Sequence, residues 1–374
     1  MLEEGGRVWI TGRDDHGQLG GGFNIHRTEN FVTSFVEVFS GAQAVAAGRS
    51  HSLVVKQDGS LWATGEGSRG QLGDGSTTAR SSFEQVVSDG VQSAAAGRSH
   101  SLMLKQDGSV WATGDNDHGE LGHGSKTGNR SFVEVISRGA KSVAAGAYHS
   151  MVLKSDGSVW VTGRNADGQL GGGFSTTDKF SFVQVMSGAK ALAAGFAHSI
   201  VLKSNGSVWA TGRNDKGQLG DGTKESRNNF VQVLSADVEA VAAGNHHSLV
   251  LKQDGSVWAT GQNNIGQLGD GSKIDKNIFV QVVCNDIYAI AAGGQRSFVL
   301  KTDGGLWATG RNYHGQLGDG TQISKLNFVQ VASFAPPIGG SWKLYTVCTR
   351  SPFKSFVPFV CVVRNLALLF HCAV

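Results

Sequence analysis

The sequence predicts an all-β fold in which similar four-stranded units form a β-propeller. Tryptophan recurs every 49 residues between Trp62 and Trp307, and a period of about 40–50 residues with strand-like segments is typical of propeller blades. The triplet Ala-Ala-Gly recurs with the same period, from the copy that ends at Gly48 to the copy that ends at Gly293. Glycine accounts for 54 of the 374 residues, which suits many short strands joined by tight turns.

Each unit reads as four strands in a fixed order. Residues 142–146 exemplify the first strand and residues 247–252 the second; the segment Val-Trp-Ala-Thr-Gly is the third, and residues 230–233 exemplify the fourth. Their apolar side chains alternate or run continuously, as in half-buried or buried strands. Asp-Gly or Asn-Gly separates the second and third strands, which predicts a hairpin with a type I′ turn. We expect Ala-Ala-Gly at the crowded axis and tryptophan between blades, with its indole N–H bonded.

The repeats divide the chain into a propeller, residues 1–334, and a tail without the repeat, residues 335–374. Residues 1–40 contain only the third and fourth strands of a blade, and no Ala-Ala-Gly follows residue 334 to complete it. Within the tail, residues 341–347 and 359–363 are candidates for the missing strands; the alternative is an aberrant C-terminus on a truncated propeller. The six full repeats are predicted at residues 41–89, 90–138, 139–187, 188–236, 237–285 and 286–334.

Composition excludes several function classes. A net charge of +3 over 374 residues gives no case for a specific nucleic acid partner. The apolar run at residues 355–374 is interrupted by Pro358 and Arg364, which argues against a membrane span. Four cysteines without a CxxC pair indicate neither a zinc site nor a disulfide framework. The N-terminus does not resemble a secretory signal, so we expect a cytoplasmic or nuclear location.

Residues that suggest catalysis, metal or cofactor binding are better explained by the framework. Histidine opens the second strand of five units, where we expect it to bond backbone at a blade corner, because equivalent positions in a ring do not bring three ligands to one ion. Residues 65–70 match GxGxxG, but no helix is predicted after them, so a dinucleotide site is not expected. We therefore predict no enzyme activity and no cofactor. The five histidines are His51, His100, His149, His198 and His247.

The unit VAAGxxHSLVLKxDGSVWATGxNxxGQLGDG resembles the repeat of the regulator-of-chromosome-condensation family, over roughly residues 1–333. This resemblance implies a seven-bladed β-propeller, and the sequence leaves open whether the ring closes. The family includes an exchange factor for a nuclear small GTPase, modules of ubiquitin ligases, a bacterial inhibitor of β-lactamases and a plant ultraviolet-B receptor. The receptor's tryptophans lie between the glycine and the histidine of GxxHS, where this sequence has none, so light sensing is not expected.

Positions at which the copies differ are the best candidates for function, because shared positions serve the fold. Two segments vary, the turn between strands one and two and the loop between strands three and four, and alternating strand directions place both on one face. Arginine and aromatic residues there suit a protein-binding surface. The candidate binding residues of the turn are Arg49, Arg98, Tyr148, Phe196, His246 and Arg296, and those of the loop are His16, Arg69, His118, Lys216 and His314.

The leading prediction is a non-enzymatic propeller that binds a protein partner. Segments that follow GQLG, such as residues 24–30 and 223–229, carry basic residues and indicate a mildly positive rim that suits an acidic partner. Exchange on a small GTPase is the alternative, although the even repeat spacing shows no wedge-like insertion of the kind the family's exchange factor uses. A substrate-targeting module related to ubiquitin ligases is the second alternative.

Overall fold

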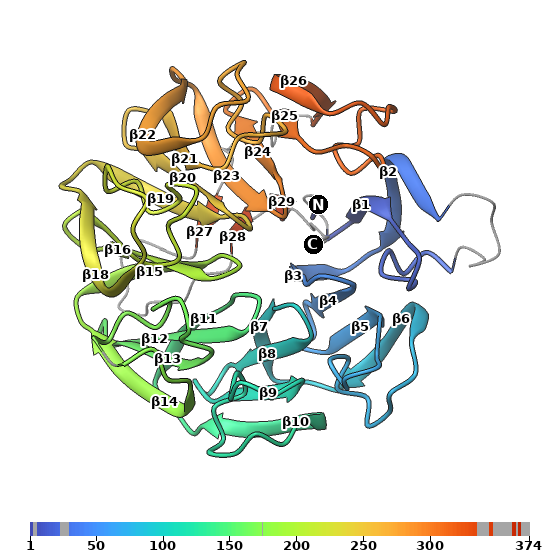
Figure 1. The fold of residues 1–374 in the computed structure, drawn as a ribbon. Helices are drawn as coiled ribbons and strands as arrows, with labels where there is room; N and C mark the ends of the chain where they lie inside the picture. The colour runs from blue at the N-terminus through green and yellow to red at the C-terminus, as the bar shows by residue number, and fades with distance from the viewer. Residues whose placement is uncertain are drawn as a thin grey trace, which may run out of the picture.

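The computed structural model shows strands arranged radially around a central axis (Figure 1). Within the described part of the chain there are strands and no helix. The structure describes residues 1–2, 6–22, 30–173, 175–334, 344–346, 361–363 and 366–367.

Six sheets of four antiparallel strands follow one another along the chain, each with its strands side by side in sequence order. The first strand of each sheet lies nearest the axis and the fourth lies at the rim (Figure 1). The bounds are β3 (Ala42–Ala47), β4 (His51–Lys56), β5 (Leu61–Gly65) and β6 (Arg80–Val87) in the first blade; β7 (Val91–Ala96), β8 (His100–Lys105), β9 (Val110–Gly114) and β10 (Asn129–Ile136) in the second; β11 (Ala140–Ala145), β12 (His149–Lys154), β13 (Val159–Gly163) and β14 (Lys179–Met186) in the third; β15 (Ala189–Ala194), β16 (His198–Lys203), β17 (Val208–Gly212) and β18 (Arg227–Leu234) in the fourth; β19 (Val238–Ala243), β20 (His247–Lys252), β21 (Val257–Gly261) and β22 (Lys276–Val283) in the fifth; and β23 (Ile287–Gly293), β24 (Arg296–Lys301), β25 (Gly305–Gly310) and β26 (Lys325–Ser333) in the sixth.

The predicted all-β propeller with four-stranded antiparallel blades is confirmed, but the predicted number of seven such blades is wrong. Six blades have four strands, and the seventh position is held by a two-stranded sheet of β1 (Val8–Arg13) and β2 (Phe31–Phe39). The physical reason is that this unit of the sequence supplies only a third and a fourth strand.

The two-stranded sheet is nevertheless joined to both of its neighbours at the rim. A β-bridge links Ser34 to Asp319 of the sixth blade, and another links Gly21 to Ser82 of the first. The same kind of bridge joins Asp74 to Ser131 between the first and second blades. The outer circumference of the ring is therefore continuous through seven positions.

The tail contains three short strands that pair with one another rather than with β1. They are β27 (Leu344–Thr346), β28 (Cys361–Val363) and β29 (Leu366–Ala367), in one antiparallel sheet. The rest of residues 341–347 and 359–363, the candidates for the missing strands, lies outside the described residues, as does most of the apolar run at residues 355–374. Among the residues that are described, no helix has the length and apolar character needed to cross a membrane.

The hairpin between the second and third strands differs from the predicted type I′ turn. The N–H of Gly59 donates to the carbonyl of Lys56 over 3.0 Å, and Gly59 has a φ of 82° whereas Asp58 is not among the residues with positive φ. This is the three-residue loop in which a type I turn is followed by a left-handed glycine. The aspartate instead stabilises the turn through its carboxylate, which accepts bonds from the N–H and the hydroxyl of Ser60 over 2.8 and 2.6 Å.

The repeated tryptophan is held by this hairpin and packs between blades, as predicted. The indole N–H of Trp160 donates to the hydroxyl of Ser158 over 3.0 Å, and the ammonium of Lys154 lies 4.2 Å from its ring centre. Trp160 also packs against the apolar cluster that contains Val110 and Leu121 of the second blade. The serine therefore joins turn and indole in one chain of hydrogen bonds.

We expect Gly305→Ser to stabilise the protein by about 1 kcal/mol, since one net hydrogen bond is worth about that much. The sixth blade has Gly305 where five other blades have the serine that accepts the indole N–H. A Cβ at Gly305 would lie 3.0 Å from Trp307 Nε1 and from a carboxylate oxygen of Asp303, and these are the two groups that the hydroxyl would join. The check is a higher denaturation midpoint in urea, with Gly305→Ala as the control that lacks the hydroxyl.

Five buried histidines tie each blade to the next. The Nε2 atom of His51 lies 2.8 Å from the hydroxyl oxygen of Ser101 in the following blade, and that hydroxyl donates its hydrogen to the carbonyl of Gln71 over 2.7 Å. Because the serine has only one hydrogen, the histidine must donate from Nε2, and Nδ1 of His51 has no hydrogen-bond partner among the described residues, as suits a neutral ring. The equivalent pairs are His100 with Ser150, His149 with Ser199, His198 with Ser248 and His247 with Ser297, at 2.9–3.1 Å.

The expectation that these histidines bond backbone within their own blade corner is therefore wrong. Their rings are completely buried and cross the boundary between blades. Burial lowers the pKa of His51 and His149 to about 4 and the pKa of His100, His198 and His247 to about 3, because a charged imidazolium would lose its hydration.

Candidate protein-binding face

The two variable segments of each blade lie next to each other, as the alternation of strand directions predicts. In the third blade the N–H of Arg164, which starts the loop between strands three and four, donates to the carbonyl of Tyr148 in the turn between strands one and two over 2.8 Å. The equivalent bond joins Arg213 to Ala197 in the fourth blade, also over 2.8 Å. Each turn is thus fixed to its loop by the backbone, and the side chains of both reach one face.

Four aromatic side chains from neighbouring blades form a continuous arc on this face, which we call the aromatic arc. The ring of Tyr148 lies 5.4 Å from that of His118 and 5.8 Å from that of Phe196, measured between ring centres. The ring of Phe196 lies 5.4 Å from that of His246. All four side chains are partly exposed, so the arc presents aromatic surface of a kind that dominates protein-binding hot spots.

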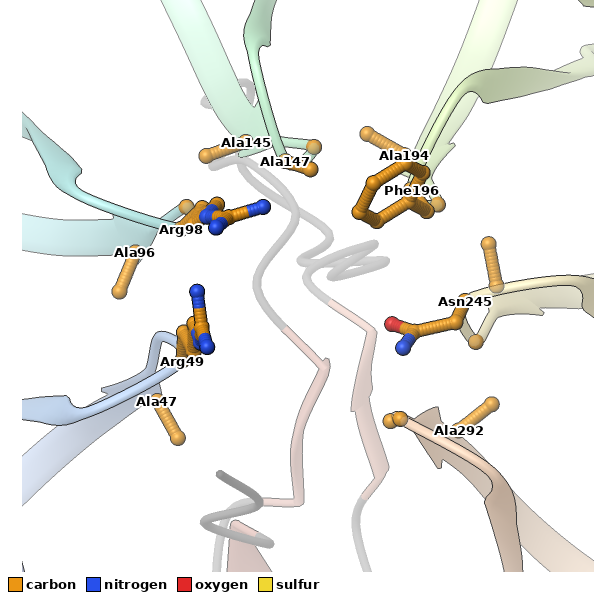
Figure 2. Close-up of a pocket in the computed structure, with 17 residues that line it drawn as sticks. Ala47, Arg49, Ala96, Arg98, Ala145, Ala147, Ala194, Phe196, Asn245 and Ala292 are labelled. Carbon is orange, nitrogen blue, oxygen red and sulfur yellow. The ribbon is translucent and has the colours of Figure 1, made fainter. Parts of the chain in front are cut away.

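Two arginine side chains contact the ring of Tyr148, and one of them, Arg98, extends the aromatic arc toward the axis. The guanidinium of Arg98 lies 5.1 Å from the ring centre of Tyr148, and the guanidinium of Arg164 lies 5.8 Å from the same ring. Arg49 is the equivalent of Arg98 in the preceding blade, and both point into the space at the axis (Figure 2). The structure therefore brings together Arg49 and Arg98 with the predicted turn residues Tyr148, Phe196 and His246.

The space at the axis is a cavity of about 190 Å³. Figure 2 shows Arg49 and Arg98 on one side of it, with Phe196 and Asn245 facing them. The wall between these side chains is made by alanines and glycines of the first strands and their turns. Small residues thus surround the axis, as the sequence predicts. They leave room at the axis for the side chains of Arg49, Arg98, Phe196 and Asn245.

A second group of predicted residues lies beside the two-stranded sheet. Arg49, His314 and Arg296 line one pocket together with Arg13. Arg296, predicted as an exposed turn residue, is in fact the first residue of β24 and is only 3% exposed. The correction follows from the alignment of the copies, since Arg296 takes the place of the buried histidine. The pKa of His314 lies below its ordinary value, first because of burial and then because of the charge of Arg13.

Three predicted loop residues stand apart from both groups. His16 is exposed and its ring lies 3.5 Å from the carboxylate of Asp15. Arg69 approaches Asp115 and Asp117 over 3.9 and 4.0 Å. Lys216 is partly exposed, and its charge helps, after burial and Arg213, to lower the pKa of His246. The predicted basic segment at residues 24–30 lies almost entirely outside the described residues.

Sequence reasoning missed two features of this face. Asn245 lines the axial cavity, and comparison of the turn position by position would have found it. Glu120 replaces the glutamine of GQLG; it is 1% exposed and its carboxylate accepts the N–H of His118 over 2.9 Å. Burial raises the pKa of Glu120 to about 7. The replacement is visible in the sequence as GELG.

The predicted GxGxxG segment is a loop between two strands. Gly67 occupies the position where other blades have a buried asparagine, and β5 and β6 flank the loop. A phosphate-binding glycine loop needs a following helix whose N-terminus faces the phosphate, and here a strand follows. The dinucleotide interpretation is excluded by this context.

Family models match most of the chain. A model described as RCC1-like domain matches residues 1–275, and a model of the regulator of chromosome condensation (RCC1) repeat matches residues 287–316. The RCC2 homolog of Xenopus laevis is 43% identical over 75 residues, which cover 20% of this chain and 14% of that protein. The ultraviolet-B receptor UVR8 of Arabidopsis thaliana is 38% identical over 85 residues, which cover 22% of this chain and 19% of the receptor. The matched segments thus span less than a fifth of these relatives.

Two solved structures share the fold over nearly their whole length. Human WBSCR16 superposes with a TM-score of 0.79 at 19% identity and covers 87% of this chain and 94% of its own. Prp20p of Saccharomyces cerevisiae superposes with a TM-score of 0.77 at 20% identity and covers 89% of this chain and 88% of its own. At this identity the similarity establishes the propeller architecture.

Proposed function

Because the chain belongs to the RCC1-like domain family, we propose that it is a non-enzymatic propeller that binds a protein partner through the face formed by the aromatic arc, Arg49 and Arg98. One observation carries the proposal. Side chains that differ between the copies meet on this face as a connected series of ring and cation contacts, from Arg98 to His246. The shared residues of the repeat, by contrast, are buried in the framework.

The chemistry of the face suits a protein partner. Aromatic and arginine side chains are enriched at the hot spots of typical interfaces, because aromatic rings bury large apolar areas and a guanidinium donates several hydrogen bonds in a fixed planar geometry. Arg164 and Arg213 are held by the carboxylates of Asp167 and Asp215 over 3.5 and 2.8 Å, so part of the polar surface is already ordered before binding. A face with fixed side chains loses less conformational entropy on association.

A small GTPase is the first class of partner to test. Prp20p, which shares the fold, is described together with its binding to Gsp1p and to histones, and yeast RCC1 (Prp20) is described bound to Kap60. The family that the sequence resembles also includes an exchange factor for a small GTPase. Five consecutive repeats here have the same length of 49 residues and show no wedge-like insertion of the kind that the family's exchange factor uses. Binding is therefore the primary proposal, and acceleration of nucleotide release is the second.

The double variant Tyr148→Ala, Phe196→Ala is expected to weaken partner binding by about thirtyfold, which corresponds to about 2 kcal/mol for a hot spot. Partners are captured from a lysate by crosslinking to the full chain, identified by mass spectrometry, and their affinity is then measured with purified protein. The matched control is Ile274→Ala, Ile323→Ala, which removes two side chains that are each 67% exposed in loops outside the arc. Capture that both variants leave unchanged would contradict the proposed face.

Release of a labelled guanine nucleotide from any captured GTPase decides the second candidate. Acceleration by the wild-type chain and its loss in Tyr148→Ala, Phe196→Ala would support exchange through the aromatic arc. Binding without acceleration would support recognition alone.

A further inference from the structure

We propose that Arg49 and Arg98 form a carboxylate-binding site at the axis, and that the partner inserts an acidic segment there which also carries one aromatic or aliphatic side chain. The inference rests on the proposed function and specifies the chemistry of the partner. It follows from the charge of the axial cavity, its size and its position beside the aromatic arc.

The two axial arginines differ from three other arginines of this face. Arg13, Arg164 and Arg213 each form an ion pair with an aspartate two or three residues further along the chain. Neither Arg49 nor Arg98 takes part in an ion pair within the described residues, although both are half-buried. Two cations in neighbouring blades therefore face one cavity without a neutralising group from the described residues (Figure 2).

A carboxylate is the group that these arginines fit best. A half-buried guanidinium has lost part of its hydration, and its planar set of N–H donors matches a carboxylate in a bidentate geometry. The ring of Tyr148 restricts the position of Arg98, and an arginine that is already positioned loses less entropy when it binds. The wall of alanine and glycine around the cavity lets a side chain approach both guanidinium groups without steric hindrance.

The cavity is too small for a large ligand and is bordered by aromatic surface. Its volume is about 190 Å³, below the range of about 300–1,000 Å³ for typical ligand pockets. It can accept one or two side chains while the backbone of the partner stays outside. Phe196 lines the cavity and continues into the aromatic arc through Tyr148 and His246. An apolar side chain next to the acidic ones would therefore pack against the arc.

The surrounding charges favour a protein segment over a nucleic acid. Asp15, Asp115 and Asp117 lie in loops on the same face, as do Asp167 and Asp215. A polyphosphate backbone gains affinity by contacting many cations along its length, and these carboxylates would repel it away from the two central arginines. A short acidic segment needs to contact only the two arginines at the centre of the face.

The experiment measures binding of a fluorescent five-residue peptide, four glutamates around a central phenylalanine, to the full chain by anisotropy. In Arg49→Gln, Arg98→Gln we expect affinity to fall about tenfold or more, since two charge-assisted contacts are removed. In the matched control Arg130→Gln, Arg138→Gln, which removes two exposed arginines away from the axis, we expect affinity within about twofold of wild type. The double variant Arg49→Lys, Arg98→Lys keeps the charge without the bidentate geometry. Its affinity for the peptide is expected to lie between that of Arg49→Gln, Arg98→Gln and that of the control.

Three results would overturn the inference: no binding of the peptide to the wild-type chain, an equal loss in both double glutamine variants, or equal binding of the peptide with glutamine in place of glutamate. Binding of a single-stranded oligonucleotide that is tighter than the peptide and equally sensitive to Arg49→Gln, Arg98→Gln would also overturn it. Unfolding midpoints of all variants confirm that they are folded. Failure of the proposed function is seen separately, as capture of partners that Tyr148→Ala, Phe196→Ala leaves unchanged.

Discussion

Lowering the pH from 7 to 5 is expected to remove a large part of the folding stability of the propeller. The five histidines that join the blades have a pKa of about 3 to 4 when folded, against about 6.5 when unfolded. Between these values the unfolded chain binds protons that the folded chain does not. Their contribution to stability is therefore fully present above pH 6.5 and is lost as the pH falls toward 4.

Two buried carboxyl groups oppose this effect. Burial raises the pKa of Glu120 to about 7 and that of Asp14 to about 6, so the folded chain binds protons there before the unfolded chain does, and these groups add stability as the pH falls. Near pH 5 these seven groups bind about three more protons in the unfolded chain than in the folded chain, five at the histidines less two at the carboxyl groups. At about 1.4 kcal/mol per proton and pH unit, these seven groups lower the stability by roughly 4 kcal/mol per unit, which is large against a typical total of about 5–15 kcal/mol.

Urea denaturation at pH 7.5, 6.5, 5.5 and 5 measures this loss directly. Glu120→Gln removes one opposing group and restores the glutamine that the other blades have. The stability of this variant should fall more steeply than that of wild type as the pH is lowered. His198→Gln removes one of the five histidines, so its stability should fall less steeply. A free energy of unfolding that stays constant between pH 7 and 5.5 would show that the histidines do not titrate as their burial requires.

Gly146→Ala is expected to destabilise the protein by about 3 kcal/mol or more, at the upper end of the range for overpacked interiors. A Cβ at Gly146 would lie 2.2 Å from Cε1 of His149 and 2.6 Å from the carbonyl oxygen of Gly195 in the next blade. Gly146 is not among the glycines with positive φ, so the effect is steric rather than conformational. The methyl group would displace the histidine and with it the bond to Ser199.

Gly139→Ala is the control for this substitution. No atom lies within 4 Å of a Cβ at Gly139, whose φ is 80°, so only the strain of a left-handed alanine remains, about 1–2 kcal/mol. Thermal and urea denaturation of both variants give the comparison. If Gly146→Ala were no more destabilising than Gly139→Ala, the histidine would not be packed against the glycine as described.

The strands of each blade could be predicted from the sequence because each strand segment occurs in six repeats. Comparison of the repeats shows which residues all copies share and which vary. The partner of each histidine could not be predicted for the same reason. His51 bonds Ser101, but every copy contains both residue types, so the sequence does not distinguish a bond within a blade from a bond to the next. The hairpin turn also differed, because the side chain of Asp58 rather than its own φ stabilises the loop.

The divergence of the copies pointed to residues that meet on one face, including Arg98, Tyr148 and Phe196. It did not predict which of them touch, since contacts such as that of His118 with Tyr148 depend on side-chain directions between blades. It also placed Arg296 in the turn, where a comparison in register assigns it to the buried histidine position. Variation in a repeat identifies a surface only at positions that are exposed in every copy.

The second to fifth blades each carry both halves of the same junction, a histidine that donates to the blade after it and a serine that accepts from the blade before it. A duplicated unit inserted beside its parent would meet complementary neighbours on both sides, so a chain of this kind can lengthen by tandem duplication without a new interface. The number of units is then limited by the curvature that brings the two ends together. Among the described junctions, Arg296 marks the place where this interchangeability ends, because the unit beside it has no second strand to offer a serine.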